Sequence, residues 1–118
     1  MVNQAIVIGR LGKDPEVKYL QNGNMVVTFS VATDESYKKD GGEKVEKTEW
    51  HNIVAYGKLA EICGNYLSKE KLVYISGKLQ TSNWEKAGVK HYKTEIIARE
   101  MKMLEKREDR NEPEAPPF

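Results

Sequence analysis

The sequence predicts an all-β domain of the OB-fold class, a five-stranded Greek-key barrel with one α-helix between its third and fourth strands. Five segments have the composition or the two-residue alternation of β-strands, and one segment has the apolar spacing of an amphipathic helix. The helix follows the third strand, which is the layout of the OB-fold. Another small barrel would fit the same order of elements.

The first two predicted strands are residues 4–10 and 25–33. The first, QAIVIGR, is rich in β-branched side chains, and an Asn-Gly pair of the hairpin-turn type separates it from the second. In the second, MVVTFSVAT, Val27, Phe29 and Val31 point to one face, and smaller, partly polar residues point to the other. This alternation predicts a strand that is buried on one face only.

The third predicted strand is the segment EWHNIVAYG at 49–57, which follows a charged loop at 38–47. Trp50 and Tyr56 are six positions apart, an even number, so both side chains lie on the same face of a strand. Asn52 lies between them and makes this face half polar. Either the face is buried, or the two rings are platforms for a flat ligand.

The helix is predicted at 58–67 and the last two strands at 72–82 and 91–103, with a turn at Ala87-Gly88. Apolar residues at helical spacing form one stripe, which we expect to face the core. The stripe consists of Leu59, Ile62, Cys63, Tyr66 and Leu67. The apolar face of the fourth strand consists of Val73, Ile75 and Leu79.

The chain of 118 residues predicts one domain at 1–105 and a short, disordered acidic tail at 106–118. Apolar residues nearly vanish after residue 105 and prolines appear. No apolar run approaches the roughly 20 residues of a membrane helix, and the N-terminal residues show no secretory signal. The single cysteine, Cys63, fits a reducing cytosol. We therefore expect a cytoplasmic protein with no membrane partner.

The chain has two Trp, six Tyr and two Phe, and we expect some of these rings to be exposed. Phe29 alternates with valines and Tyr66 lies on the helical stripe, so both are predicted to be in the core. Four others sit out of phase with an apolar face or within charged segments: Tyr37, Trp50, Tyr56 and Trp84. Exposed aromatics indicate a contact surface, either with a second subunit or with another ligand.

Lysines accompany these four aromatics in the sequence. The nearest are Lys38, Lys39, Lys58, Lys78 and Lys86. Aromatics interleaved with cations are typical of surfaces that bind single-stranded nucleic acid, because every base offers a π-face and every phosphate a negative charge. Each lysine alone would also fit an ordinary solvated surface.

The sequence contains little that could support catalysis, and we expect no enzyme, no metal and no cofactor. His51 and His91 have no cysteine or histidine at metal-binding spacing. Cys63 lies on the apolar stripe of the helix, where a small core residue is expected. The segment GRLGKD lacks the spacing of a phosphate-binding loop.

Five blocks of sequence, in order, carry a resemblance to a known family. They are VIGRLGKDPEVKY at 7–19, FSVATDES at 29–36, TEWHNIVAYGKLAE at 48–61, VYISGKLQT at 73–81 and YKTEI at 92–96. Together they resemble the bacterial single-stranded DNA-binding proteins, SSB, over nearly the whole predicted domain. The resemblance implies an OB-fold that assembles as a homotetramer and binds single-stranded DNA.

The resemblance also implies roles for individual residues. Bases would stack at the positions of Tyr37, Trp50, Tyr56 and Trp84, although well-known members have Trp and Phe where this chain has Tyr37 and Tyr56. The matching basic positions are Lys18, Lys58 and Lys69. Some members carry Arg or Lys at the positions of Asn52, Gln80, Ser82 and Asn83. His51 would lie in a subunit interface.

The end of the chain matches the family only in part. Members often have a long Gly- and Gln-rich linker that ends in several aspartates and Pro-Phe. This chain has almost no linker, but Pro117 and Phe118 match the tip, and Glu112 and Glu114 supply acid. The resemblance therefore implies weak docking of replication and repair proteins on Pro117 and Phe118.

The leading hypothesis is a sequence-nonspecific single-stranded DNA-binding protein, associated with the nucleoid, that protects unwound DNA in replication, recombination and repair. The first strand has apolar residues on both faces, so we expect Ile6 and Ile8 to contact a second subunit. Two alternatives remain open. One is an OB-fold assembly protein of the replication-restart type, which acts mainly through protein contacts, and the other is an RNA-binding OB module.

Overall fold

The computed structural model describes residues 1–105. The predicted tail at 106–118, with the docking residues Pro117 and Phe118, lies outside the described residues. In chain order the described elements are β1 (Ala5–Leu11), β2 (Glu16–Tyr19), β3 (Met25–Asp34), β4 (Tyr37–Lys38), β5 (Lys44–Val45), β6 (Thr48–Tyr56), α1 (Gly57–Tyr66), β7 (Leu72–Lys86) and β8 (Val89–Met103). The five predicted strands correspond to β1, β3, β6, β7 and β8.

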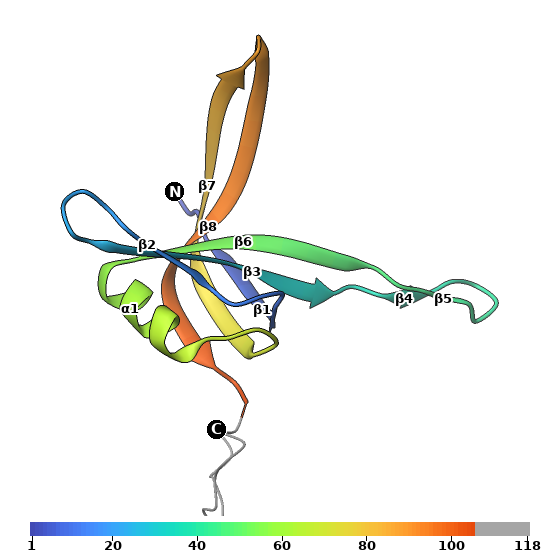
Figure 1. The fold of residues 1–118 in the computed structure, drawn as a ribbon. Coiled ribbons are helices and arrows are strands. Elements are labelled where there is room, and N and C mark those ends of the chain that lie inside the picture. The colour runs from blue at the N-terminus through green and yellow to red at the C-terminus, as the bar shows by residue number, and fades with distance from the viewer. Residues whose placement is uncertain (106–118) are drawn as a thin grey trace, which may run out of the picture.

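Pairing of these five strands closes a ring. β1 pairs with β7, β7 with β8, β8 with β6 and β6 with β3, and the end of β1 returns to β3 through the pairs Arg10–Ala32 and Leu11–Val31. Within this ring β6 and β8 run parallel, and the other neighbours are antiparallel. This closed order confirms the predicted OB-fold (Figure 1).

The interior of the ring is apolar because alternate residues of each strand point inward. Val27, Phe29 and Val31 of β3 are buried, as the alternation predicts. The other buried residues of the core include Val7, Leu11, Ile53, Ala55, Val73, Ile75 and Ile96. The opposite residues of β3 and β6 are left on the outer face of the barrel, where a ligand can reach them.

Helix α1 begins and ends one residue earlier than predicted and turns a different face to the barrel. Ala60 and Cys63 are fully buried, whereas Ile62 is 40% exposed and Tyr66 is 61% exposed. The prediction that Tyr66 belongs to the core is therefore wrong. A Cβ on Gly64 would contact β3 side chains, so the helix lies against the barrel through its small residues. This close approach turns the two larger side chains outward.

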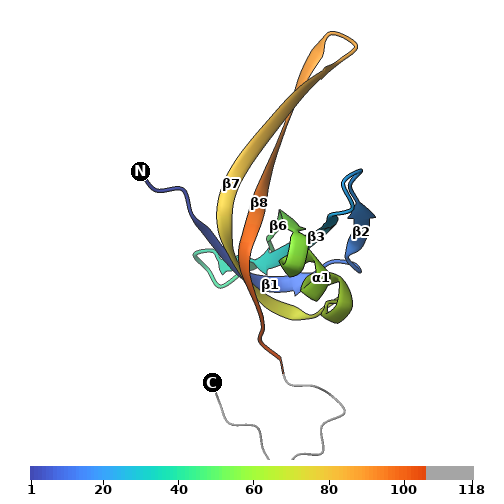
Figure 2. The same ribbon diagram turned by 90° about the vertical axis from the view of Figure 1, so that its left-hand side faces the viewer.

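Two arms project from the barrel in Figure 1, and Figure 2 shows the β7–β8 arm from another side. The long arm is the outer part of the β7–β8 hairpin, and the short arm is the segment that ends in β4 and β5. The radius of gyration of the Cα atoms is 17.2 Å, whereas a compact domain of 100 residues has about 13 Å. The difference is consistent with arms that lie outside the core.

The long arm was predicted only in part. Strand β7 continues to Lys86, beyond the predicted end at residue 82, and the turn lies at Ala87 and Gly88 as predicted. Both turn residues have positive φ, 55° and 80°, which is the requirement of a two-residue type I′ turn. Leu79 has the same parity as Ile75 but is 46% exposed, because β7 leaves the barrel near this residue.

Candidate nucleic-acid interface

The outer face of the β2–β3–β6 sheet carries two of the four predicted aromatics. Trp50 lies opposite Ala32 and Tyr56 lies opposite Val26 in the β3–β6 register. Their side chains are 56% and 48% exposed, respectively, so they are not part of the core. They are six positions apart, which corresponds to about 20 Å along a strand. Val54 lies on the same face of β6 but is only 4% exposed. The face predicted from the sequence is therefore open at Asn52 and at its two rings, and closed at Val54.

The indole of Trp50 lies against the β1–β2 loop. A Cβ built on Gly12 would be 2.8 Å from Cη2 and 3.5 Å from Cε3 of this indole. The loop is held to the sheet by the Gly12 N–H, which donates to the Ser30 carbonyl at 3.1 Å. One side of the ring is thus supported by the loop while much of the ring remains exposed.

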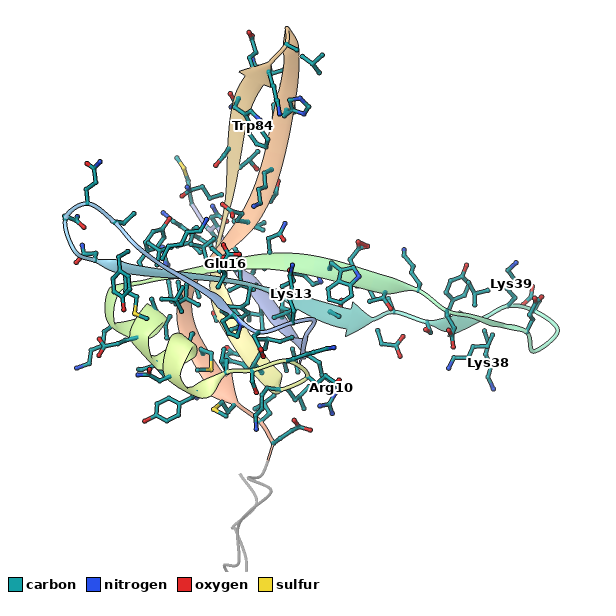
Figure 3. The ribbon with its side chains drawn as sticks, in the orientation of Figure 1. Arg10, Lys13, Glu16, Lys38, Lys39 and Trp84 are labelled. Atoms are coloured by element: carbon teal, nitrogen blue, oxygen red, sulfur yellow. The ribbon has the colours of Figure 1, made fainter. Side chains whose placement is uncertain are left out.

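Trp84 is placed on the long arm, where it stacks on a residue of the facing strand (Figure 3). Trp84 and His91 are cross-strand partners, with ring centroids 5.6 Å apart and 20° between the ring planes. Trp84 is 46% exposed, so its indole is supported from one side and open elsewhere. Trp84 was predicted as a site residue but its partner was not, because the fourth strand was predicted to end at residue 82, before Trp84.

Tyr37 is placed on the short arm and is 52% exposed. Beside it, Lys38 and Lys44 are direct cross-strand partners. The two positive charges repel each other unless an anion lies nearby. Figure 3 shows Lys38 and Lys39 near the tip of this arm, far out from the barrel.

A side-chain turn precedes the short arm. Asp34 accepts hydrogen bonds from the hydroxyl of Ser36 at 2.5 Å and from its backbone N–H at 3.0 Å. These two hydrogen bonds hold the pKa of Asp34 below its usual value of 3.8. An ionised Asp34 therefore favours the turn that directs the chain into β4.

A polar pocket of about 240 Å³ lies on the outer face between the β1–β2 loop, β3, β6 and β8. Asn52 and Ser30 line it from the sheet, and its charged residues are the cations Lys13 and Lys93 and the acids Asp14, Glu16 and Glu95. Neither lysine was predicted as a site residue. The segments that carry them are distant in the sequence, and only the barrel closure brings them together.

The predicted lysines are distributed over several surfaces. Lys18 lies opposite Val26, which also faces Tyr56, so Lys18, Val26 and Tyr56 form one row across three strands. Lys18 also pairs with Glu16 at 3.4 Å. Lys78 is half-buried on β7, and Lys86 is exposed at the end of the long arm.

Two other predicted lysines lie on α1 or just after it. Lys58 lines a separate hollow between α1 and the β2–β3 hairpin. Lys69 lies in the loop after α1, where its backbone N–H donates to Asp14 at 2.8 Å. The structure thus groups Lys18 with Tyr56 and does not group Lys58 or Lys69 with either tryptophan.

The predicted subunit-contact residues are accessible or half-buried. Ile6 and Ile8 on β1 are 56% and 54% exposed. Among the described residues, β1 pairs with β3 only at Arg10 and Leu11, so the earlier part of this strand has a free edge. His51 is half-buried, with its Nε2 3.0 Å from the hydroxyl of Thr33.

Other chemistry within residues 1–105 is limited. Cys63 is fully buried, and this burial raises the pKa of its thiol to about 11, which disfavours the reactive thiolate. The described part of the chain holds no group of three or more His, Cys, Asp or Glu that could bind a metal. None of its helices has the length and apolar character needed to cross a membrane.

Comparisons with known sequences all indicate the same protein family. The model of the Single-strand binding protein family matches residues 2–104. "Single-stranded DNA-binding protein 1" of Xylella fastidiosa is 50% identical over 112 residues, which cover 93% of this chain and 82% of that protein. A single-stranded DNA-binding protein of Neisseria meningitidis is 52% identical over 104 residues, 87% of this chain. The matched residues span only 60% of the Neisseria protein.

Solved structures agree with the sequence comparisons. A Plasmodium falciparum SSB, solved in complex with single-stranded DNA, aligns with a TM-score of 0.82 at 34% identity. The alignment covers 89% of this chain and 96% of that one. A deletion variant of the single-stranded DNA-binding protein from Thermus aquaticus aligns with a TM-score of 0.77 at 28% identity, over 90% of this chain and 52% of that one.

Proposed function

Because this chain belongs to the Single-strand binding protein family, we propose that it binds single-stranded DNA without sequence preference. The observation that carries the proposal is the placement of four exposed rings on the outer face of β6 and on the two arms. Tyr37, Trp50, Tyr56 and Trp84 are 46–56% exposed, although each would stabilise a core if buried. Rings left open on this family's fold are best explained as stacking platforms for bases.

The proposed mechanism joins stacking to charge neutralisation. A base that stacks on an aromatic side chain contributes about 1–3 kcal/mol, and any base can do so because each has a π-face. Lysines contact the phosphates between stacked bases and release their counterions. No hydrogen bond to a particular base edge is needed, so the proposed binding is insensitive to sequence.

The outer face of β3 and β6 supplies a path between two of the rings. From Trp50 to Tyr56 the strand passes Asn52, and β3 contributes the small side chains Ala32 and Ser30 beneath this path. Small residues leave room for the planes of bases to approach the sheet. In this proposal the two arms extend the path, with Trp84 on the long arm and Tyr37 on the short one.

The cations beside this path are partly offset by acids. Lys18 is paired with Glu16, and Lys93 is paired with Glu95 at 3.5 Å. The Lys18–Glu16 pair is exposed, and such pairs contribute about 0–1 kcal/mol, so a phosphate can displace this carboxylate at low cost. In the second pair the Glu95 side chain is only 18% exposed. We propose that both lysines, together with Lys13, Lys78 and Lys86, contact the DNA backbone.

We propose that the chain acts as a homotetramer. The support is the outer face of β1, which exposes Ile6 and Ile8, together with the free edge of the same strand. A free edge can pair with a second copy, and two apolar side chains would be covered by that contact. His51 is proposed to lie in a further contact between subunits.

The proposed biological role is protection of unwound DNA during replication, recombination and repair, in the cytoplasm at the nucleoid and without catalysis. Partner proteins of these processes are proposed to dock weakly on Pro117 and Phe118, at the end of the segment REDRNEPEAPPF. Acidic residues such as Glu112 and Glu114 would steer the tip toward basic partners.

Fluorescence anisotropy with labelled oligo-dT, oligo-rU and duplex DNA of one length tests the proposed function. We expect oligo-dT to bind most tightly, oligo-rU more weakly and duplex DNA least at the same salt concentration. Equal affinity for oligo-rU would favour the RNA-binding module. Tighter binding of the duplex, or no binding of any of the three, would contradict the proposal.

A further inference from the structure

Gly12 has no backbone reason to be glycine. The described glycines with positive φ are Gly23, Gly41, Gly42, Gly57 and Gly88. Gly12 is not among them, so its backbone conformation is one that alanine also adopts. The obstacle to a side chain at this position is therefore spatial.

The nearest obstacle at Gly12 is the ring of Trp50. A Cβ there would lie 2.8 Å from Cη2, nearer still to Cζ3 and 3.5 Å from Cε3, and these three ring atoms are its nearest neighbours. At Gly9 and Gly77, by contrast, a Cβ would meet the backbone of the neighbouring strand first. Gly9 and Gly77 are thus explained by strand packing, whereas Gly12 is explained by the indole.

We propose that Gly12 is a positioning residue for single-stranded DNA binding, because its missing side chain lets the Trp50 indole lie against the β1–β2 loop. The inference rests on the proposed function. With the loop on one side, the indole is held in one orientation and keeps its other side open to a base. A methyl group at Gly12 would push the ring away from the loop.

The position of the indole also fixes where the stacked base lies relative to a cation. Lys13 follows Gly12 directly and lines the polar pocket together with Asn52, which is two residues from Trp50. A base on the correctly placed indole would therefore have its phosphate beside Lys13. A displaced indole would separate the stacking interaction from this charge.

The first experiment measures the position of the indole without DNA. The chain has two tryptophans, so a Trp84→Phe protein reports on Trp50 alone. In this background we expect Gly12→Ala to increase acrylamide quenching of Trp50 fluorescence, because the ring leaves the loop. Gly64→Ala is the matched control, since that glycine lies on α1 and contacts β3, and quenching should not change.

The second experiment measures affinity for labelled oligo-dT. Gly12→Ala should weaken binding by at least about fivefold, the lower end of what one stacked base contributes. The same substitution in a Trp50→Ala background should change affinity by less than about twofold, because the ring it displaces is gone. Gly64→Ala should leave affinity unchanged.

Three results would overturn the inference: unchanged quenching in Gly12→Ala, unchanged affinity in Gly12→Ala, or an equal loss of affinity in the Trp50→Ala background. If Gly12→Ala unfolds the chain, the double variant Gly12→Ala, Trp50→Ala should be folded again, as measured by circular dichroism. A double variant that stays unfolded would also overturn the inference. A wild-type chain that ignores oligo-dT would contradict the proposed function, while the quenching measurement would still decide the role of Gly12.

Discussion

Trp84 and His91 stack across the β7–β8 arm, with their ring centroids 5.6 Å apart and 20° between their planes. The arm is a two-stranded ribbon outside the barrel, where isolated hairpins are only marginally stable. A cross-strand aromatic pair stabilises such a ribbon by about 0.5–1.5 kcal/mol beyond the area it buries. The same contact supports one side of an indole whose remaining surface is open to solvent.

Replacing His91 tests whether this support matters for binding. We expect His91→Ala to weaken oligo-dT binding by up to about 1.5 kcal/mol, because Trp84 loses its stacking partner. His91→Phe should restore most of the affinity, since a phenyl ring can stack in the same place. The measurement is the dissociation constant for each variant. Equal loss in His91→Ala and His91→Phe would mean that the imidazole acts through its nitrogen atoms instead.

The pairing of Arg10 with Glu105 predicts a stability that depends on pH. Arg10 Nη1 donates to Glu105 Oε2 at 2.8 Å, and the Leu72 N–H donates to Oε1 at 3.2 Å. These two hydrogen bonds hold the pKa of Glu105 below its usual value of 4.5, and the one from Arg10 has the larger effect. A carboxylate with a lowered pKa stabilises the fold above its usual value and loses that contribution as pH falls toward the folded-state pKa.

We therefore expect Glu105→Gln to melt at a lower temperature than the wild type at neutral pH. The difference should shrink as pH falls below 4.5, the usual pKa of this carboxyl, because the wild type then loses the same charge. Thermal melts across this range, followed by circular dichroism, provide the measurement. A difference in melting temperature that stayed constant with pH would show that the charge of Glu105 does not contribute.

The outer face of β1 predicts how the assembly can be broken. Ile8 is 54% exposed, so Ile8→Glu should leave the fold of the chain intact while placing a charge in the proposed subunit contact. We expect light scattering to give a multi-subunit mass for the wild type and a smaller mass for this variant. Leu20→Glu, at an exposed position after β2, is the matched control. A monomeric wild type would contradict the proposed assembly.

Removal of Glu112–Phe118 should separate DNA binding from partner recruitment. These residues lie outside the described structure and beyond the predicted boundary at residue 105, so affinity for oligo-dT should be unchanged. Pull-down of replication and repair proteins should be reduced, because the proposed docking tip is gone. An unchanged pull-down would remove Pro117 and Phe118 from the proposal.

Local patterns predicted the strands and the exposed rings because both follow from the two-residue period of a strand. Trp50 and Tyr56 are exposed, as their parity against Ile53 predicts, whereas Val54 shares that parity and is only 4% exposed. The strands β2, β4 and β5 have only two to four residues, which is too short for a pattern. Tyr66 was misplaced because helical spacing gives a stripe but does not say which edge of that stripe meets the barrel.

Contacts between distant segments could not be predicted from patterns. Gly12 meets Trp50 because barrel closure brings the β1–β2 loop to the outer face of β6. Arg10 and Glu105 are 95 residues apart in the sequence, and their ion pair depends on β1 and β8 flanking β7. Lys13 and Lys93 line one pocket for the same reason.

The most direct test of the account is the affinity of three single variants for oligo-dT. Trp50→Ala and Trp84→Ala should each weaken binding by about 1–3 kcal/mol and retain the circular dichroism spectrum of the wild type. Tyr66→Ala, which removes an exposed ring on the helix, should bind as the wild type does. Full affinity in both tryptophan variants would contradict the claim that open rings on the barrel and its arm hold the bases.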